Sequence, residues 1–197
     1  MKKMKKKILV SLLIFSALAC KQEVKKTKTS DKEMINTEQK QEPIQKMRSL
    51  TIALNPKSNS TVTGTAKFVE TNGMVQMTAV IKGLSEGSHA IHIHQTADCT
   101  SADGKSAGGH WNPTSQPHGK WGAETGYHKG DIGNFKVKNA ADETTVEFST
   151  DEWCIGCGDD SKDILGKGVI VHQGVDDFVS QPSGAAGSRV SCGGIIK

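Results

Sequence analysis

Short runs with the pattern of β-strands constrain this chain most. Apolar and polar residues alternate at 50–54 and 74–81, and residues 61–69 are rich in β-branched side chains. Further short runs lie at residues 90–94, 145–148, 168–172 and 189–196. Alternation with a period of two is typical of β-strands that bury one face. Many short strands separated by Gly, Pro and Asn turns predict a sandwich or barrel. Two long segments, 95–134 and 176–188, lack this pattern, and loops of such length usually serve a function.

The first 47 residues differ in charge from the rest of the chain. They contain 12 basic and 5 acidic residues, a net charge of +7, whereas residues 48–197 contain 13 basic and 16 acidic residues, a net charge of −3. A nucleic-acid-binding domain needs a basic face. We therefore expect the folded part, residues 48–197, not to bind nucleic acid.

The start of the chain has the pattern of an export signal. Five lysines between Lys2 and Lys7 precede the apolar stretch Ile8–Ala19, which is too short to span a membrane as a helix. The segment resembles a bacterial lipoprotein signal, in which a small residue precedes the cysteine, here Cys20. We expect residues 1–19 to be a signal peptide and Cys20 to be acylated. Ala17 and Ala19 also fit ordinary signal cleavage, so a plain secreted protein that starts at Cys20 is the alternative.

Residues 20–47 are rich in Lys, Gln, Glu and Thr and have almost no aliphatic periodicity. This composition predicts a disordered tether that follows the lipidated N-terminus. An amphipathic helix is the alternative, although the charges are not sorted onto one face. We expect the protein in the bacterial cell envelope, on the periplasmic or outer-surface side, held to the membrane by the lipid on Cys20.

All seven histidines lie in the predicted β-domain, between residues 89 and 172. His92 and His94 are two residues apart on a predicted strand, so their rings share one face while Ile91 and Ile93 face the core. The other candidate ligands are His110, His118, His128, Asp131 and His172. Three His and one Asp form a closed tetrahedral zinc set, and four His suit a tetragonal copper centre. Seven side chains would then fill eight ligand positions, so one imidazole would be shared.

These motifs resemble the copper/zinc superoxide dismutases over roughly residues 50–197. The matching stretches are 87–94 (GSHAIHIH), 109–113 (GHWNP), 118–119 (HG), 128–134 (HKGDIGN), 169–172 (VIVH) and 187–193 (GSRVSCG). The resemblance implies an all-β, eight-stranded Greek-key barrel or sandwich with two long functional loops. It also implies one copper and one zinc per subunit, and dismutation of superoxide to oxygen and hydrogen peroxide by copper that cycles between Cu(II) and Cu(I).

The resemblance also implies a role for each site residue. Copper would be held by His92, His94, His110 and His172, and zinc by His110, His118, His128 and Asp131, with His110 as the bridging imidazolate. Asp176 would hydrogen-bond His92 and His118 behind the metals. Catalysis would use Arg189 to hold the superoxide anion and His110 to return a proton to the departing peroxide. A purely structural role is the alternative for Arg189, and His89, which lies off the ligand set, is expected to be structural.

The cysteines other than Cys20 form two predicted pairs. Cys99 and Cys192 match the disulfide of the same family. Cys154 and Cys157 form a C-x-x-C outside the family pattern. A structural disulfide is the favoured interpretation, with free thiols, metal binding or a redox role as alternatives.

Two other classes of function compete with the enzyme. A copper and zinc carrier on the same fold would use the same ligands but would not need Arg189. An interaction module built on the tether and the C-x-x-C has no specific support. Segment 176–184 contains no lysine, so Lys120 and Lys129 are the candidates for steering superoxide. The oligomeric state stays open, with a homodimer as one option.

Overall fold

The computed structural model describes residues 47–197. The predicted signal peptide 1–19, the predicted lipidation site Cys20 and residues 20–46 of the predicted tether lie outside the described residues. The first strand begins at Arg48. Within residues 47–197, no helix is long and apolar enough to cross a membrane.

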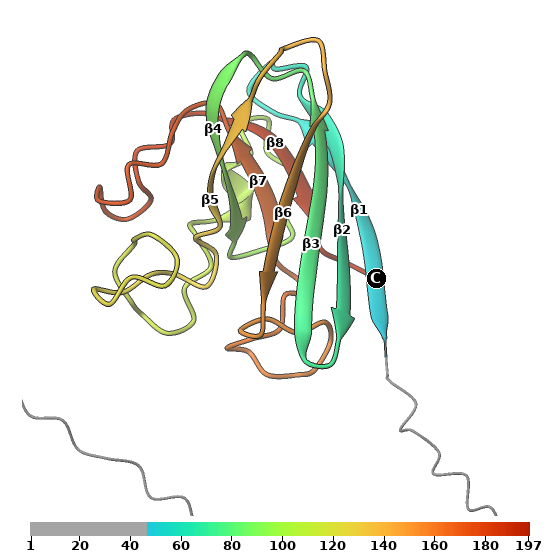
Figure 1. Ribbon diagram of the computed structural model, residues 1–197, viewed down its shortest axis with the longest axis vertical. Helices are drawn as coiled ribbons and strands as arrows, with labels where there is room; N and C mark the ends of the chain where they lie inside the picture. Colours follow the sequence, from blue (N-terminus) through green and yellow to red (C-terminus); the bar gives the residue numbers. More distant parts are fainter. Residues whose placement is uncertain (1–46) are drawn as a thin grey trace, which may run out of the picture. The chain divides into compact units, whose positions relative to one another are not determined.

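Eight antiparallel strands form the described part of the chain (Figure 1). They are β1 (Arg48–Pro56), β2 (Thr63–Thr71), β3 (Met74–Lys82), β4 (Gly87–His94), β5 (Gly133–Val137), β6 (Thr144–Thr150), β7 (Gly168–His172) and β8 (Arg189–Gly194), with one short 3-10 helix, η1 (Lys105–Ala107). The strand order is β5-β4-β7-β8-β1-β2-β3-β6. Because β5 and β6 are consecutive in the chain but lie at opposite ends of this order, the sheet curls into a nearly closed barrel. The prediction of an all-β Greek-key barrel is confirmed.

Strand β5 is the one strand of the described region that the alternation did not reveal. The segment predicted to be a loop, 95–134, includes its first two residues. The strand is only five residues long and its exposed positions include Asn134 and Lys136, so it has little apolar signal. Pairing with β4, in which Ala90 lies opposite Asn134, defines this strand.

The core lies between two halves of the barrel, one formed by β1, β2, β3 and β6 and the other by β4, β5, β7 and β8. Strand β3 shows the pattern most clearly, because Val75, Met77, Ala79 and Ile81 are all buried and alternate with more exposed residues. Strands β1, β2, β4 and β7 contribute Leu54, Phe68, Ile91, Ile93, Val169 and Val171 to the same core cluster. Each fully buried aliphatic or aromatic side chain stabilises the fold by about 1.5–3 kcal/mol.

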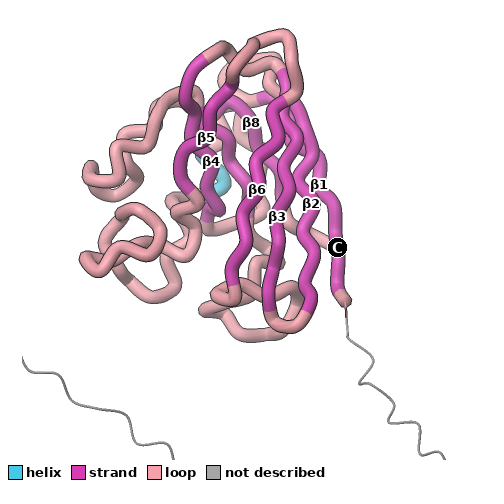
Figure 2. Tube along the Cα trace, viewed as in Figure 1, coloured by secondary structure: helices cyan, strands magenta, loops and turns pink. Residues whose placement is uncertain are grey.

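Strand β4 is buried on both faces, and this positions the candidate site. Its inward residues Ile91 and Ile93 belong to the core, while His92 and His94 on the outer face are also buried. Two loops project on this side of the barrel (Figure 1). We call residues 95–132 the first loop and residues 173–188 the second loop; apart from η1 both lack regular structure (Figure 2).

Candidate metal centre

The first cluster at this face consists of four buried histidines. His92 and His94 come from β4, His110 from the first loop and His172 from the end of β7, and one ring nitrogen of each lies within 4.8 Å of the others. His94 Nδ1 donates to the Gly108 carbonyl at 2.9 Å, which leaves its Nε2 free to accept. That Nε2 lies 3.4 Å from His172 Nε2, so the two nitrogens face the same point.

The second cluster consists of His110, His118, His128 and Asp131, all buried and all from the first loop. The Asp131 carboxylate lies at its centre. Oδ1 is 2.8 Å from His110 Nδ1, and Oδ2 is 3.0 Å from His118 Nδ1. His128 Nδ1 is 3.3 Å from Oδ1. Three imidazoles and one carboxylate are the ligand types of a closed zinc site.

His110 belongs to both clusters. Its Nδ1 faces Asp131, whereas its ring lies 4.0 Å, centroid to centroid, from the ring of His92 in the first cluster. His110 also forms an isolated antiparallel bridge with His94. The backbone of the first loop therefore continues the edge of β4 and directs this ring between the two sets.

The donor atoms fit a pair of metal ions. His92 Nδ1 and His110 Nε2 are buried and have no hydrogen-bond partner within residues 47–197. His118 Nδ1 and His128 Nδ1 face the Asp131 carboxylate at 3.0 and 3.3 Å, but without hydrogen-bond geometry. Buried polar atoms without partners are costly. Several of them converging in one place are what a metal-binding site requires.

One carboxylate behind the rings connects the two clusters. Asp176 accepts from His92 Nε2 through Oδ2 and from His118 Nε2 through Oδ1, each at 2.9 Å. Its backbone is fixed by Asn134, which donates to the Asp176 carbonyl and accepts from its amide, each at 2.8 Å. These bonds set the tautomer of both rings, so that Nδ1 is the nitrogen presented to a metal.

Three histidines of the first cluster, His94, His110 and His172, favour the neutral ring. Burial lowers the pKa of His94 and of His172 well below the usual value for histidine, and the neighbouring histidines of the cluster lower both further. Burial likewise lowers the pKa of His110 to about 4, although Asp131 opposes the shift. Neutral imidazole is the form that binds a metal.

His118 and the carboxylates of Asp131 and Asp176 favour their charged forms instead. Burial alone would lower the pKa of His118, but the adjacent carboxylates of Asp131 and Asp176 outweigh it and raise this pKa to about 9. Burial disfavours the charged form of Asp131 and Asp176, yet the histidine partners prevail and hold the pKa of each well below its usual value.

Arg189 lines the open side of the site. In the pairing of β7 with β8 it lies opposite His172, and its Nη1 donates to the Gly104 carbonyl in the first loop at 2.8 Å. The hollow there has a volume of about 330 Å³ and is lined by Gln95, Gly109, His110, Asn112, His128, Pro182, Ser183 and Arg189. Both loops therefore contribute to one mouth over the histidines.

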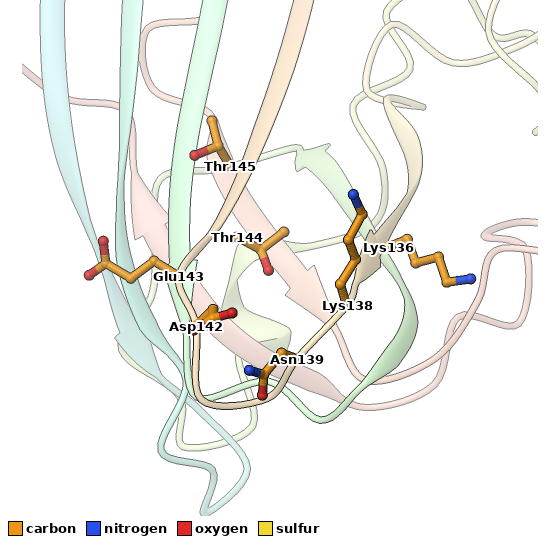
Figure 3. A pocket seen from close by; sticks show the side chains of 7 residues that line it. All are labelled: Lys136, Lys138, Asn139, Asp142, Glu143, Thr144 and Thr145. Carbon is orange, nitrogen blue, oxygen red and sulfur yellow. The ribbon is translucent and has the colours of Figure 1, made fainter.

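A separate hollow lies at the turn between β5 and β6. It has a volume of about 270 Å³ and is lined by Lys136, Lys138, Asn139, Asp142, Glu143, Thr144 and Thr145 (Figure 3). Neither histidine cluster contributes a residue to it. Its charged residues are of both signs, and we assign it no function.

The other predicted residues are placed as follows. His89 Nε2 donates to the Ser85 carbonyl at 2.9 Å, away from both clusters. Cys99 is bonded to Cys192, and Cys154 to Cys157. Lys120 is exposed.

Lys129 does not suit the steering role that the sequence suggested for it. It forms an ion pair with Glu152, and its side chain is only 17% exposed. The charge that it would present to an anion is therefore offset by a neighbouring carboxylate.

Sequence reasoning missed several residues that hold the site together. Asn134 fixes Asp176, Gln95 lines the mouth, and Gln181 binds the backbone of His118 by accepting from its amide at 2.8 Å and donating to its carbonyl at 2.9 Å. Uncharged amides carry no recognisable chemistry in a sequence. Their roles depend on which loops meet in space.

Comparison with known proteins gives consistent similarities. Residues 62–195 match the family described as copper/zinc superoxide dismutase (SODC). Superoxide dismutase (Cu-Zn) 2 of Aquifex aeolicus is 34% identical over 137 residues, which cover 67% of this chain and 78% of that protein. Extracellular superoxide dismutase (Cu-Zn) of Caenorhabditis elegans is 33% identical over 138 residues, which cover 67% of this chain and 60% of that protein.

The fold is similar to that of a solved structure. A double mutant of a SOD-like protein from Bacillus subtilis aligns with a TM-score of 0.66 and 28% identity, covering 75% of this chain and 97% of the other. The single-mutant structure of the same protein gives a TM-score of 0.66 at 26% identity.

Proposed function

Because this chain belongs to the copper/zinc superoxide dismutase family, we propose that its two histidine clusters hold the copper and the zinc with which it dismutates superoxide to oxygen and hydrogen peroxide. Copper would be held by His92, His94, His110 and His172, and zinc by His110, His118, His128 and Asp131. When bound, copper supplies one-electron exchange between Cu(II) and Cu(I), and zinc is structural. The shared position of His110 between the clusters carries this assignment.

His110 is the residue that we assign to proton transfer. Its Nε2 is buried on the side of the first cluster without a hydrogen-bond partner in the described region, while Nδ1 faces Asp131. Nε2 is therefore the atom that can hold a proton for peroxide. The carboxylate of Asp131 keeps the ring oriented from the opposite side.

Arg189 is the residue that we assign to anion binding. A guanidinium keeps its charge at any working pH, and its hydrogen bond to Gly104 leaves the other donors for a ligand in the mouth. The bond to Gly104 supports a structural role as well, because it connects β8 to the first loop. We expect both roles to be filled by the same side chain.

Metal content measured together with superoxide consumption tests these assignments. The purified protein should bind one copper and one zinc and consume superoxide. Arg189→Ala should keep both metals but react more slowly by about tenfold or more. His110→Ala should weaken the binding of both metals. Full metal content in His110→Ala would contradict the bridging role.

A copper and zinc carrier would give a different result in the same experiment. It would bind both metals without turnover, and Arg189→Ala would have no effect. The presence of Arg189 in the mouth beside His110 favours the enzyme.

We further propose that the chain is exported and anchored in the cell envelope through Cys20. Disulfides persist in oxidising compartments, and two are present here. The nematode relative is described as extracellular. The lysines and apolar stretch before Cys20 support a signal peptide over residues 1–19, followed by the tether over 20–47. In bacteria that produce Cys20→Ser, activity should move from the membrane fraction to the soluble fraction, and intact mass should lose the lipid.

A further inference from the structure

The residues on both sides of His128 are attached to one short segment that follows β6. Tyr127 Oη donates to Glu152 Oε1 at 2.5 Å, and Lys129 Nζ donates to Glu152 Oε2. Trp153 Nε1 donates to the Lys129 carbonyl at 2.8 Å. We propose that Glu152 and Trp153 are positioning residues for the zinc ligand His128. This inference rests on the proposed role of His128 in zinc binding.

The attachment is rigid because Trp153 belongs to the core. Trp153 is 1% exposed, and its ring lies 5.0 Å from that of Phe148 and 6.5 Å from that of Phe68, centroid to centroid. Trp121, in the first loop, lies 6.0 Å from Trp153 and 4.9 Å from Tyr127. Aromatic contacts of this kind stabilise the fold beyond the contribution of the apolar area that they bury. The indole N–H of Trp153 is therefore held in a fixed position next to the Lys129 carbonyl.

The C-x-x-C extends the same segment. Cys154 is bonded to Cys157, and its backbone donates to the Lys162 carbonyl at 2.8 Å and accepts from Ile164 at 3.1 Å. Asp163 accepts from the amides of Gly156 and Gly158 at 2.8 and 3.0 Å. The residues after Trp153 thus form a compact loop, residues 151–167, at the end of the barrel where β6 ends (Figure 1). The C-x-x-C disulfide therefore stabilises the segment that carries Glu152 and Trp153.

The same contacts argue against a third metal site at the C-x-x-C. The Asp163 carboxylate lies near both sulfurs, but it accepts from three backbone amides, those of Gly156, Gly158 and Leu165. The two sulfurs are bonded to each other. A ligand role would require both the disulfide and these hydrogen bonds to be given up.

The effect on His128 is preorganisation. Its ring must point Nδ1 toward Asp131, to which its own amide also donates at 2.8 Å. The other histidine at this end, His118, is instead held by Asp176 and Gln181. Loss of the attachment at Glu152 and Trp153 should therefore loosen His128 and leave His118 in place. Residues that orient metal ligands typically change metal affinity by about 10–100-fold when they are removed.

Two variants separate the contribution of Glu152 from that of Trp153. Trp153→Phe removes the indole donor and keeps an aromatic ring, while Glu152→Ala removes both carboxylate contacts at a partly exposed position where the fold should tolerate the change. Glu147→Gln, on an exposed position of β6, is the matched charge control. Zinc affinity is measured by competition with a chelator. The electronic spectrum of the protein with Co(II) in the zinc position reports the ligand geometry.

We expect each variant to bind zinc about tenfold more weakly, with an altered cobalt spectrum and unchanged copper affinity. Glu147→Gln should behave as wild type. Wild-type zinc affinity and cobalt spectrum in folded Glu152→Ala would overturn the inference, as would equal weakening of copper and zinc. His128→Ala separates this failure from failure of the proposed function: if His128→Ala binds zinc as tightly as wild type, the zinc assignment itself is wrong.

Discussion

At the scale of single residues, His118 couples metal binding to pH. It lies between the carboxylates of Asp131 and Asp176, and these raise its pKa to about 9 although burial opposes the shift. Below pH 9 the metal-free ring is therefore protonated. Zinc binds only the neutral ring, so binding at pH 7 must displace this proton, and zinc affinity should fall about tenfold for each unit by which the pH is lowered.

Calorimetry of zinc binding to the metal-free protein checks this expectation. Titrations at pH 7 in two buffers of different ionisation enthalpy should differ in heat by the equivalent of about one released proton. Identical heats in the two buffers would show that His118 is already neutral.

Gly184 leaves no room for a side chain over the Asp176 carboxylate. Its φ is +68°, and a Cβ built there would lie 1.8 Å from Asp176 Oδ1 and 2.6 Å from His118 Nε2. Gly184→Ala should push the carboxylate off both histidines and weaken both metals by about 10–100-fold. Gly122→Ala is the control, because its φ is +79° but nothing lies within 4 Å. Equal metal affinities in the two variants would contradict the prediction.

The proposed ligand residues could be predicted from the sequence because their chemistry is distinctive. His92 and His94 share a face by strand geometry alone, and counting eight ligand positions against seven side chains pointed to a shared imidazole. Gly184 and Asn134 could not be identified in this way. Their importance comes from the close approach of the second loop to β5 and the first loop, which no local pattern encodes.

At the scale of elements, the strands were easier to predict than the loops. Alternation is strong where one face is buried, as in β3, and weak in β5, where Gly133 and Asn134 offer no apolar pattern. The first loop is held by backbone bonds between distant residues, such as Trp111 N to the Ile93 carbonyl at 2.9 Å. Such bonds do not depend on side-chain type and leave no trace in the sequence.

The two disulfides close segments of very different length, and their contributions to stability should differ accordingly. Cys99 and Cys192 are 93 positions apart, whereas Cys154 and Cys157 are 3 apart. Loop-closure entropy predicts that the free energy of unfolding falls by about 4–5 kcal/mol in the Cys99→Ser, Cys192→Ser double variant. The Cys154→Ser, Cys157→Ser double variant should lose about 2 kcal/mol.

Denaturant unfolding of the metal-free proteins measures both losses without the contribution of bound metal. If removal of the short disulfide lowers the free energy of unfolding as much as removal of the long one, then native contacts rather than chain entropy determine the contribution of the short disulfide.

At the scale of the whole molecule, the charge of the folded part opposes the approach of its substrate. Residues 48–197 carry a net charge of −3, and superoxide is an anion. Lys120, exposed and two residues after His118, remains the candidate for local attraction, since Lys129 is paired with Glu152. Lys120→Gln should lower the rate at low ionic strength by up to about tenfold and reduce its dependence on salt.

Lys67→Gln provides the comparison, because Lys67 is exposed on β2 in the other half of the barrel. Superoxide consumption is measured for both variants over a range of ionic strength. If the two salt profiles coincide, Lys120 does not steer the substrate.

The Cys99–Cys192 bond also affects how the molecule would respond to proteolysis. It makes residues 99–192 a covalent ring that contains His110, His118, His128, Asp131 and His172. Exposed loop tips are the usual sites of cleavage, and the second loop and residues 99–132 of the first loop lie within this ring. A single cut in either of these segments would open the ring without releasing a fragment, so the nicked chain would keep every proposed ligand on one molecule. Only a second cut could release a piece of the metal centre.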